Sequence, residues 1–430
     1  MKRALIITYY WPPIGGSGVQ RWVKFAKYLP SEGWQPVIYT PENPDLSSID
    51  ESLLNDIPSE AEIIKRPIIE PYNIYRKLTG SKGQIKIEAN PGGGGKGSFL
   101  KRLSMWVRGN LFMPDPRCLW IRPSVRFLKK YLKEHPVDVI ISTGPPQSMH
   151  LIARKVSLAT GIPWVADFRD PWTKIFYFKH LRLGKWAERK HHILEQQVLD
   201  DATAVVAVSP LVQQDFAAMT STPVHLVTNG YDESDYTEDI VTDGNFNVVH
   251  TGLLTAEGNP VELWKALGEK CANDTDFASK FRLVLAGRTD KKVLEDISKA
   301  GLDNFLTDYG YIDHNKAVQL QRSASLLILP IREEPETKAI LPGKLFEYLA
   351  ARRPILGVGT SEGAMATVLQ ETNAGKIFNW GDSEDISKHI DGLWNECKNG
   401  KEIVLNADIE QYSRRMTTKK MVELFNNITK

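Results

Sequence analysis

The chain has 430 residues, of which 42% are apolar and 25% are charged, and its net charge is only +2. This length exceeds what one hydrophobic core usually serves, so we expect a globular protein of roughly two domains. Three widely spaced cysteines disfavour a disulfide framework and a cysteine zinc site. No apolar run approaches the roughly 20 residues of a membrane-spanning helix, and the N-terminus has the pattern of a strand instead of a signal peptide. We therefore expect a cytoplasmic protein.

The first half of the chain alternates predicted strands with predicted helices. The predicted strands, each a short apolar run, cover residues 3–9, 36–40, 137–142, 163–166, 204–208 and 224–227. Gly15, Gly16 and Gly18 follow the first strand, and glycines at such a turn let the backbone approach a ligand closely. The third glycine of the dinucleotide-binding fingerprint is missing, so we expect a ligand-facing loop of another kind. A tight turn without a ligand is the alternative.

A basic stretch rich in aromatic residues lies at residues 96–133. Its only acid is Asp115, and its basic residues are Lys96, Lys101, Arg102, Arg108, Arg117, Arg122, Arg126, Lys129, Lys130 and Lys133. Trp106, Trp120 and other aromatic residues lie among them, a composition typical of a contact with an anionic membrane surface. A solvated helix pair whose apolar face packs on the core is the alternative. Nucleic acid is disfavoured, because the rest of the chain lacks a basic groove.

Charged side chains follow the predicted strand at 163–166. Asp167 and Asp170 flank Arg169, just beyond the carboxyl end of this strand. Parallel-sheet domains bind their ligands at the carboxyl ends of strands, so these residues are candidates for catalysis or substrate contact. A structural Arg–Asp network that only holds the loop is the alternative.

The second half repeats the alternation, with predicted strands at 247–250, 281–286, 306–311, 326–330 and 355–358. Alternating strands and helices in both halves predict two doubly wound α/β domains with parallel sheets that face one cleft. We place these domains at residues 1–238 and 244–405, with an acidic linker between them. The last segment, 406–430, is expected to form a helix that packs back on the first domain.

The segment 341–356 combines a loop, a helix and a strand. Pro342 and Gly343 break the chain before a helix in which Lys344 occupies the first turn. The helix dipole disfavours a cation there, so Lys344 makes more sense beside a bound anion such as a phosphate. Glu347 lies on nearly the same face, where its carboxylate can accept two hydrogen bonds from ribose hydroxyls. A phosphate contact next to a sugar contact indicates a nucleotide, and an incidental Lys–Glu pair is the alternative.

Several motifs along the chain resemble those of bacterial family 4 glycosyltransferases. They read YYWPPIGGSGVQRW, STGPPQSMHLIA, WVADFRDPWT, VTNGYD, VVHTG and LPGKLFEYLAARRPIL. The resemblance implies two Rossmann-like domains in the GT-B architecture, and a retaining transfer of a sugar from a nucleotide-diphosphate donor without a bound metal or other cofactor. The donor is expected against the second domain and the acceptor against the first. The implied acceptor is a saccharide or a polyprenyl-diphosphate-linked saccharide for a surface polysaccharide, at the inner face of the plasma membrane.

The resemblance also implies roles for individual residues. The donor would be held by Gly15, Gly16, Gly252, Arg288, Ile312, Gly343, Lys344 and Glu347, with Lys344 at the diphosphate and Glu347 at the ribose. The acceptor side and the transferred sugar would meet the candidate catalytic residues His150, Asp167, Arg169 and Asp170. The implied mechanism is a front-face attack in which the departing phosphate takes the acceptor proton.

Two departures from the family pattern leave other functions open. The family commonly has two glutamates separated by seven residues, and Ala339 stands where the first of them would precede Glu347. The stretch after Gly252 reads LLTAEGNP and lacks the arginine and lysine that many relatives place there. A non-catalytic nucleotide-sugar-binding subunit of an assembly complex is therefore one alternative. A nucleotide-sugar epimerase or phosphorylase on the same fold is another.

Overall fold

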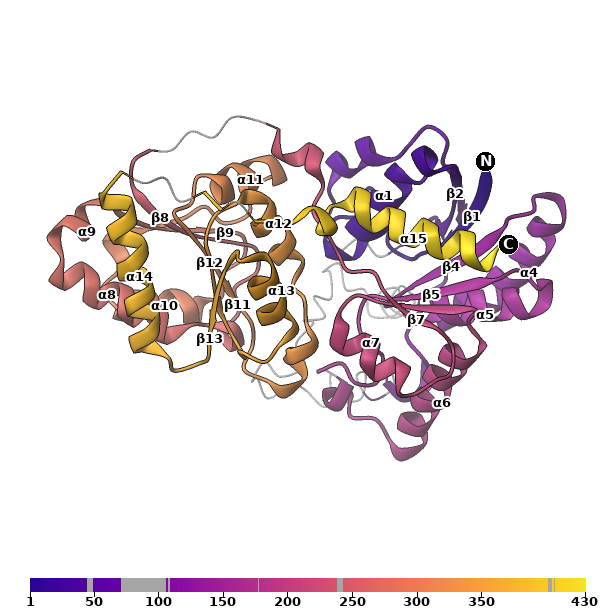
Figure 1. Ribbon diagram of the computed structural model, residues 1–430. Coiled ribbons are helices and arrows are strands. Elements are labelled where there is room, and N and C mark those ends of the chain that lie inside the picture. Colours follow the sequence, from indigo (N-terminus) through magenta and orange to yellow (C-terminus); the bar gives the residue numbers. More distant parts are fainter. Residues whose placement is uncertain are drawn as a thin grey trace. The chain divides into compact units, whose positions relative to one another are not determined.

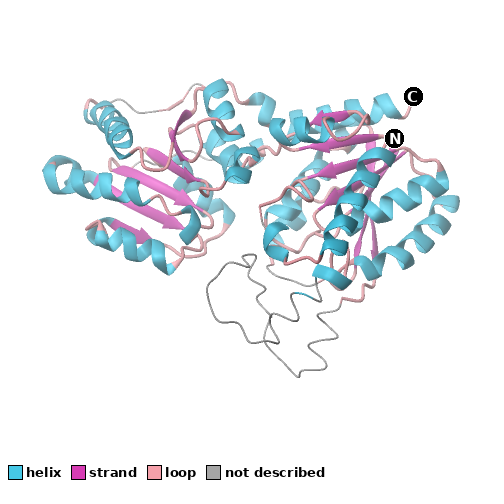
Figure 2. Ribbon diagram, turned by 90° about the horizontal axis from the view of Figure 1, so that it is seen from below, coloured by secondary structure: helices cyan, strands magenta, loops and turns pink. Residues whose placement is uncertain are grey.

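The computed structural model describes residues 1–44, 49–70, 106, 109–176, 178–237, 243–400, 404–405 and 407–430. The chain forms two compact units, Met1–Thr228 with Thr417–Lys430 and Asn229–Met416. In each unit, helices cover both faces of one sheet (Figures 1 and 2). Lys96, Lys101, Arg102 and Arg108 of the predicted basic stretch lie outside the described residues, as does part of the predicted acidic linker.

The first unit contains a seven-stranded parallel sheet in the order β3-β2-β1-β4-β5-β6-β7. Its strands are β1 (Lys2–Ile7), β2 (Trp34–Pro41), β3 (Glu62–Arg66), β4 (Val139–Gly144), β5 (Trp164–Phe168), β6 (Ala204–Ala207) and β7 (Val224–Leu226). Its helices are α1 (Ser17–Tyr28), α4 (Cys118–Glu134), α5 (Ser148–Thr160), α6 (Lys185–Asp201), α7 (Pro210–Ala217) and α15 (Arg414–Ile428). The strand order reverses between β1 and β4, so the loops after these strands border the crevice in which such sheets hold ligands.

Apolar runs explain the buried strands of this unit. Residues 4–7 of β1 are fully buried, because helices cover a central parallel strand on both faces. α15 supplies Met421, Leu424 and Phe425 to the same core as α1, which it accompanies in Figure 1. Trp34 of β2 packs edge-on against Phe425, with ring centroids 5.3 Å apart. The last helix of the chain therefore completes the hydrophobic core of the first unit.

The second unit contains a six-stranded parallel sheet in the order β10-β9-β8-β11-β12-β13. Its strands are β8 (Phe246–Thr251), β9 (Phe281–Ala286), β10 (Leu306–Asp308), β11 (Leu326–Pro330), β12 (Ile355–Val358) and β13 (Gly375–Phe378). Its helices are α8 (Val261–Asn273), α9 (Thr275–Lys280), α10 (Lys291–Lys299), α11 (His314–Arg322), α12 (Gly343–Ala351), α13 (Ala364–Thr372) and α14 (Ser383–Lys398). Here the order reverses between β8 and β11.

The predicted fold class, two doubly wound α/β domains with parallel sheets, is confirmed. The sequence analysis did not predict β3 or β13, and several predicted strands extend past the observed ends. The largest excess is at 306–311: β10 ends at Asp308, because Gly310 adopts a left-handed φ of +59° that interrupts extended backbone. Within the described part of the chain, every helix is too short or too polar to span a bilayer.

Candidate functional site

The start of α12 in the second unit carries a charged pair. Lys344 Nζ lies 2.6 Å from Glu347 Oε2, and Gln321 Nε2 of α11 donates a 3.0 Å hydrogen bond to the same oxygen. Burial by itself raises the pKa of the Glu347 carboxyl, but Lys344 and Gln321 more than offset this effect and hold the pKa below its ordinary value. Glu347 is therefore a carboxylate at neutral pH, and two donors fix its position.

One glycine turn packs against this pair, and a second glycine turn packs against the first. Gly252 follows β8 with a φ of +121°, and a Cβ at this position would lie 3.4 Å from Lys344 Cε. Gly287 follows β9 with a φ of +129°, and its Cβ would lie only 2.1 Å from the Gly252 carbonyl oxygen. These turns require glycine. The structure thus brings Gly252, Gly343, Lys344 and Glu347 together where the strand order of the second sheet reverses.

Side chains that the sequence analysis did not name as site residues hold this site in place. Gln321 also donates to Thr251 Oγ1 at 2.8 Å, and the Thr251 N–H donates to the Tyr348 hydroxyl at 2.8 Å. The Tyr236 hydroxyl donates to the Glu347 carbonyl oxygen at 3.1 Å. Tyr348 adjoins Glu347 and Thr251 adjoins Gly252, whereas Gln321 and Tyr236 lie far from both motifs in sequence. Only the folded chain reveals that they support it.

His314, the first residue of α11, adds a titratable group to the same site. Its Nε2 lies 3.2 Å from Asp235 Oδ2. The hydrogen bond to Asp235 raises the pKa of His314 against the opposing effect of burial, and the nearby Glu347 carboxylate raises it further. A protonated imidazole is therefore favoured close to Glu347.

Two of the predicted donor contacts lie outside this cluster. The Arg288 side chain is 74% exposed, and its Nη2 is 3.9 Å from Asp290 Oδ1. Its carbonyl oxygen accepts a 2.9 Å hydrogen bond from Leu254 N–H, so the Arg288 backbone adjoins the loop that follows β8. Ile312 is half-buried, and its neighbour Tyr311 is 85% exposed. The donor contacts of Arg288 and Ile312 stay predictions.

In the first unit, Asp167 at the end of β5 is fully buried in a hydrogen-bond network. Arg21 of α1 donates to both carboxylate oxygens, with Nη2 at 2.8 Å from Oδ1. Trp22 Nε1 and Thr143 Oγ1 donate to Oδ2 at 2.7 and 3.0 Å. Burial raises the pKa of Asp167, but Arg21 and the other donors outweigh it and the net pKa is lowered. The carboxylate joins β5 to α1 and β4, as expected for a residue that positions the following loop.

Arg169 and Asp170 lie in that loop. Arg169 Nη1 donates to the Gly18 carbonyl oxygen at 2.7 Å, and Nη2 donates to the Pro145 carbonyl oxygen, so this side chain ties the first turn of α1 to the loop after β4. Burial raises the pKa of Asp170 to about 6, although Arg169 opposes the rise. Asp170 can therefore exchange a proton near neutral pH, as general acid–base chemistry requires.

His150 is fully buried on α5 and stacks on Phe168, with ring centroids 4.4 Å apart. Its Nδ1 lies 2.7 Å from Ser142 Oγ, and burial lowers the pKa of His150 to about 3, so the ring is neutral at pH 7. A Cβ at Gly144 would lie 2.5 Å from both His150 Nε2 and Gln147 Oε1. These two polar atoms therefore meet beside the loop after β4. Gln147 is a further candidate contact that sequence reasoning missed.

Gly15 and Gly16 precede α1 in the loop after β1. Gly16 has a φ of +98°, a conformation that favours glycine, and Gly15 is buried. Because neither residue has a side chain, each could contact a donor only through its backbone atoms. Their contact with a donor stays a prediction.

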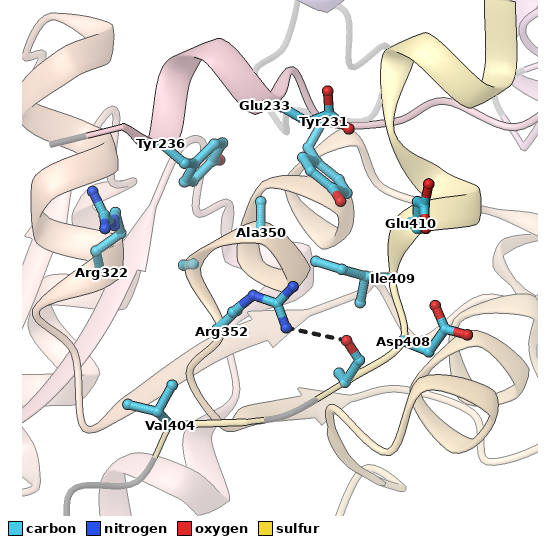
Figure 3. A pocket seen from close by; sticks show the side chains of 12 residues that line it. Tyr231, Glu233, Tyr236, Arg322, Ala350, Arg352, Val404, Asp408, Ile409 and Glu410 are labelled. Carbon is cyan, nitrogen blue, oxygen red and sulfur yellow. Dashed lines mark hydrogen bonds between the residues drawn. The ribbon is translucent and has the colours of Figure 1, made fainter.

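A cavity of about 530 Å³ lies at the other end of α12 (Figure 3). It is lined by Tyr231, Glu233, Tyr236, Arg322, Ala350, Ala351, Arg352, Val404, Ala407, Asp408, Ile409 and Glu410. Arg352 donates across it to the Ala407 carbonyl oxygen at 3.1 Å. None of the predicted site residues lines this cavity. Tyr236 lines it and also donates the hydrogen bond to the Glu347 carbonyl oxygen. Neither here nor elsewhere among the described residues do three His, Cys, Asp or Glu side chains gather so as to hold a metal ion.

Comparisons with known proteins agree with this arrangement. Residues 93–235 match a family model described as Glycosyltransferase Family 4, and residues 246–396 match one described as Glycosyl transferases group 1. No curated protein sequence matches the chain.

Similar solved structures cover the whole chain at low sequence identity and show the fold. Sucrose-phosphate synthase from Thermosynechococcus elongatus has a TM-score of 0.62 at 12% identity, over 100% of this chain and 99% of that one. HepE from Anabaena, in complex with UDP-glucose, has a TM-score of 0.61 at 14% identity, over 99% and 100%. A variant of S. aureus TarM in complex with fondaparinux, α-GlcNAc-glycerol and UDP has a TM-score of 0.60 at 10% identity, over 99% and 100%. The two family matches, with this fold, identify the chain as a glycosyltransferase of the GT-B architecture.

Proposed function

We propose that the protein transfers a sugar, with retention of configuration and without a metal, from a nucleotide-diphosphate donor to a saccharide or a polyprenyl-diphosphate-linked saccharide. The pathway that we propose is surface polysaccharide biosynthesis at the inner face of the plasma membrane. The observation that carries this proposal is the partly exposed Lys344–Glu347 pair beside Gly252 at the reversal of the second sheet.

The donor contacts follow from the chemistry of this pair. Lys344 lies in the first turn of α12, where backbone N–H groups and the helix dipole also favour an anion. Glu347 is ionised and held in place, so it can accept hydrogen bonds from ribose hydroxyls. Two of the similar structures contain UDP-glucose or UDP, which supports a nucleotide sugar as the donor.

Charge stabilisation is the main catalytic contribution that we assign to the second unit. When the nucleoside diphosphate departs, negative charge builds on its phosphate oxygens. Lys344 and the amides of the glycine turns would stabilise that charge, an effect that often supplies most of an enzyme's rate enhancement. Front-face attack, with the departing phosphate taking the acceptor proton, is the corresponding mechanism for the acceptor hydroxyl.

The membrane location has support from α4. The apolar face of α4 packs in the core: Trp120 stacks on Tyr39 with ring centroids 5.0 Å apart, and Leu128 is fully buried. The opposite face is exposed and basic, with Arg122, Arg126, Lys129, Lys130 and Lys133. Each basic residue near an anionic leaflet contributes about 1 kcal/mol, so four or five together would hold the protein reversibly.

A thermal-shift screen against UDP, GDP, ADP and dTDP tests the donor site. A ligand at about 100 times its Kd should stabilise the fold by about 2.7 kcal/mol. Lys344→Ala should abolish the response to the active nucleotide, whereas Lys265→Ala, which removes an exposed lysine from α8, should preserve it. No response of the wild-type protein to any of the four nucleotides would contradict the proposal.

A non-catalytic, nucleotide-sugar-binding subunit is the second candidate function. Ala339 favours it, because this residue offers no carboxylate to the transferred sugar. Hydrolysis of a donor sugar by the purified protein, lost in Lys344→Ala, would exclude this candidate. Nucleotide binding without hydrolysis or transfer would favour it over the enzyme.

A further inference from the structure

Two tryptophans of the first unit are exposed to solvent. Trp186 near the start of α6 is 68% exposed, and Trp106 is 48% exposed. The other tryptophans of this unit are all buried: Trp11, Trp22, Trp34, Trp120, Trp164 and Trp172. Large apolar side chains that gather on a surface mark a contact with a partner or a membrane.

Asn110 ties together the two chain segments that carry the exposed tryptophans. Its Nδ2 donates to the carbonyl oxygens of Trp106 and Arg182 at 2.9 and 3.5 Å, and its Oδ1 accepts from Gly184 N–H at 2.7 Å. Arg182 has a φ of +52°, a conformation that a residue other than glycine rarely adopts unless surrounding contacts hold it. Trp186 comes two residues after Gly184, so the chain positions of both tryptophans are tied together.

Exposed basic and apolar side chains lie close to these tryptophans along the chain. Arg182, Lys185 and Arg189 are exposed, and none of the three forms an ion pair with a residue that the structure describes. Leu111, which directly follows Asn110, is 62% exposed. We call this set the tryptophan patch; its members are Trp106, Leu111, Arg182, Lys185, Trp186 and Arg189. Glu188 is the one exposed acid in the first two turns of α6.

The helix that begins in the tryptophan patch also holds the loop that carries Asp170. On the buried face of α6, His191 Nδ1 accepts from Trp172 Nε1 at 3.0 Å. Glu195 Oε1 accepts from the N–H groups of Trp172 and Thr173, each at 3.2 Å. α6 therefore connects the patch to the candidate acceptor loop through a short set of buried hydrogen bonds.

We propose that the tryptophan patch docks on an anionic membrane surface and thereby places the Asp170 loop next to a lipid-linked acceptor. This inference rests on the proposed function and adds α6 to the membrane contact. Tryptophan side chains favour the boundary between headgroups and acyl chains, and unpaired arginine and lysine are attracted by anionic lipids. The patch carries several cations among its aromatic residues and has only one acid beside it. This charge pattern fits the uniformly negative surface of an anionic membrane better than the mixed charges of a protein surface.

Co-sedimentation with vesicles tests this surface. The wild-type protein should bind vesicles of phosphatidylcholine with phosphatidylglycerol, and bind phosphatidylcholine alone much more weakly. The affinity of the double variant Lys185→Gln, Trp186→Ser for anionic vesicles should fall at least about tenfold, because the loss of one positive charge alone accounts for about fivefold. The matched control is Lys155→Gln, Leu158→Ser, which removes one exposed cation and one exposed apolar residue from α5 and should bind as the wild type does.

Nucleotide-induced stabilisation, measured on the same samples, separates the outcomes. If the double variant keeps that stabilisation but loses vesicle binding, the tryptophan patch is established as the docking surface. If the double variant fails to fold, Arg189→Gln alone should still weaken binding severalfold. If the double variant binds anionic vesicles as well as the control variant does, the inference is overturned. If the wild type does not bind anionic vesicles but is still stabilised by nucleotide, the docking surface is overturned and the proposed transferase stands. If the wild type instead binds selectively to an acidic protein, the docking surface is likewise overturned.

Discussion

Replacing Glu347 by Gln tests the ribose contact with little change of shape. Lys344 and Gln321 engage Glu347 Oε2 at 2.6 and 3.0 Å, so Oε1 is the oxygen for which the described residues supply no hydrogen bond. A hydrogen bond to a charged group contributes roughly 1.5–3 kcal/mol. Losing one such bond to a ribose hydroxyl should weaken the binding of a ribonucleoside diphosphate about 10- to 150-fold.

Calorimetric titration with a ribonucleoside diphosphate and its 2′-deoxy analogue isolates this contact. The wild type should bind the ribonucleotide more tightly, and Glu347→Gln should bind both nucleotides with nearly equal affinity. Glu384→Gln is the matched control, because Glu384 also pairs with a lysine on its own helix, Lys388 at 2.7 Å. A Glu347→Gln protein that still distinguishes the two nucleotides as the wild type does would refute the assignment.

Three further substitutions test the residues around the candidate site. Asp167→Asn leaves the buried Arg21 guanidinium without its charge partner and should destabilise the fold by about 3–5 kcal/mol, seen as a lower midpoint in urea; an unchanged midpoint would contradict the network. Asp170 has a pKa raised from 3.8 to about 6, so the folded state binds its proton more tightly than the unfolded state does between these values. The free energy of unfolding of the wild type should therefore fall, relative to that of Asp170→Asn, as pH rises from about 4 to 6. If the two proteins show the same dependence of this free energy on pH, the raised pKa of Asp170 is contradicted. His314 has a raised pKa, so its stabilising effect is complete below the ordinary pKa of 6.5 and is lost as pH rises through the folded value. The stability deficit of His314→Gln should accordingly be larger in acid than in alkaline buffer, and a deficit independent of pH would exclude the Asp235 contact as its cause.

Most of the fold follows from sequence pattern, because buried parallel strands are short apolar runs and glycine or proline breaks them. The predicted strand at 3–9 overlaps β1 (Lys2–Ile7), and the predicted strand at 281–286 coincides with β9. The end of β10 was missed, since the conformation of Gly310 depends on its neighbours in space: its carbonyl oxygen accepts from Gly287 N–H at 2.6 Å.

The site was predictable where its residues are close in sequence. Helical periodicity alone places Lys344 and Glu347 on one face, and the structure pairs them at 2.6 Å. Composition could not separate Trp106 from Trp120, which lie in the same basic stretch. Trp120 is buried against Tyr39, whereas Trp106 is exposed, as is Trp186 in a distant segment. Packing between residues far apart in sequence determines which aromatic side chains are exposed to solvent.

The two sheets share a strand order, so equivalent helix starts in the two units can be compared as positions for the proposed diphosphate. α5 and α12 occupy equivalent places, each following the strand beside the reversal point. At the start of α5, Ser148 N–H and Oγ donate to the Asp115 carboxylate at 2.8 and 2.9 Å, so the protein fills that anion-binding position with its own side chain. This contact also explains the single acid in the basic stretch. α12 begins without a side-chain cap, and the Lys344 side chain beside it is 31% exposed. Of these two equivalent helix starts, the one that the protein leaves open for the proposed diphosphate is that of the second unit, where the charged pair and the glycine turns meet.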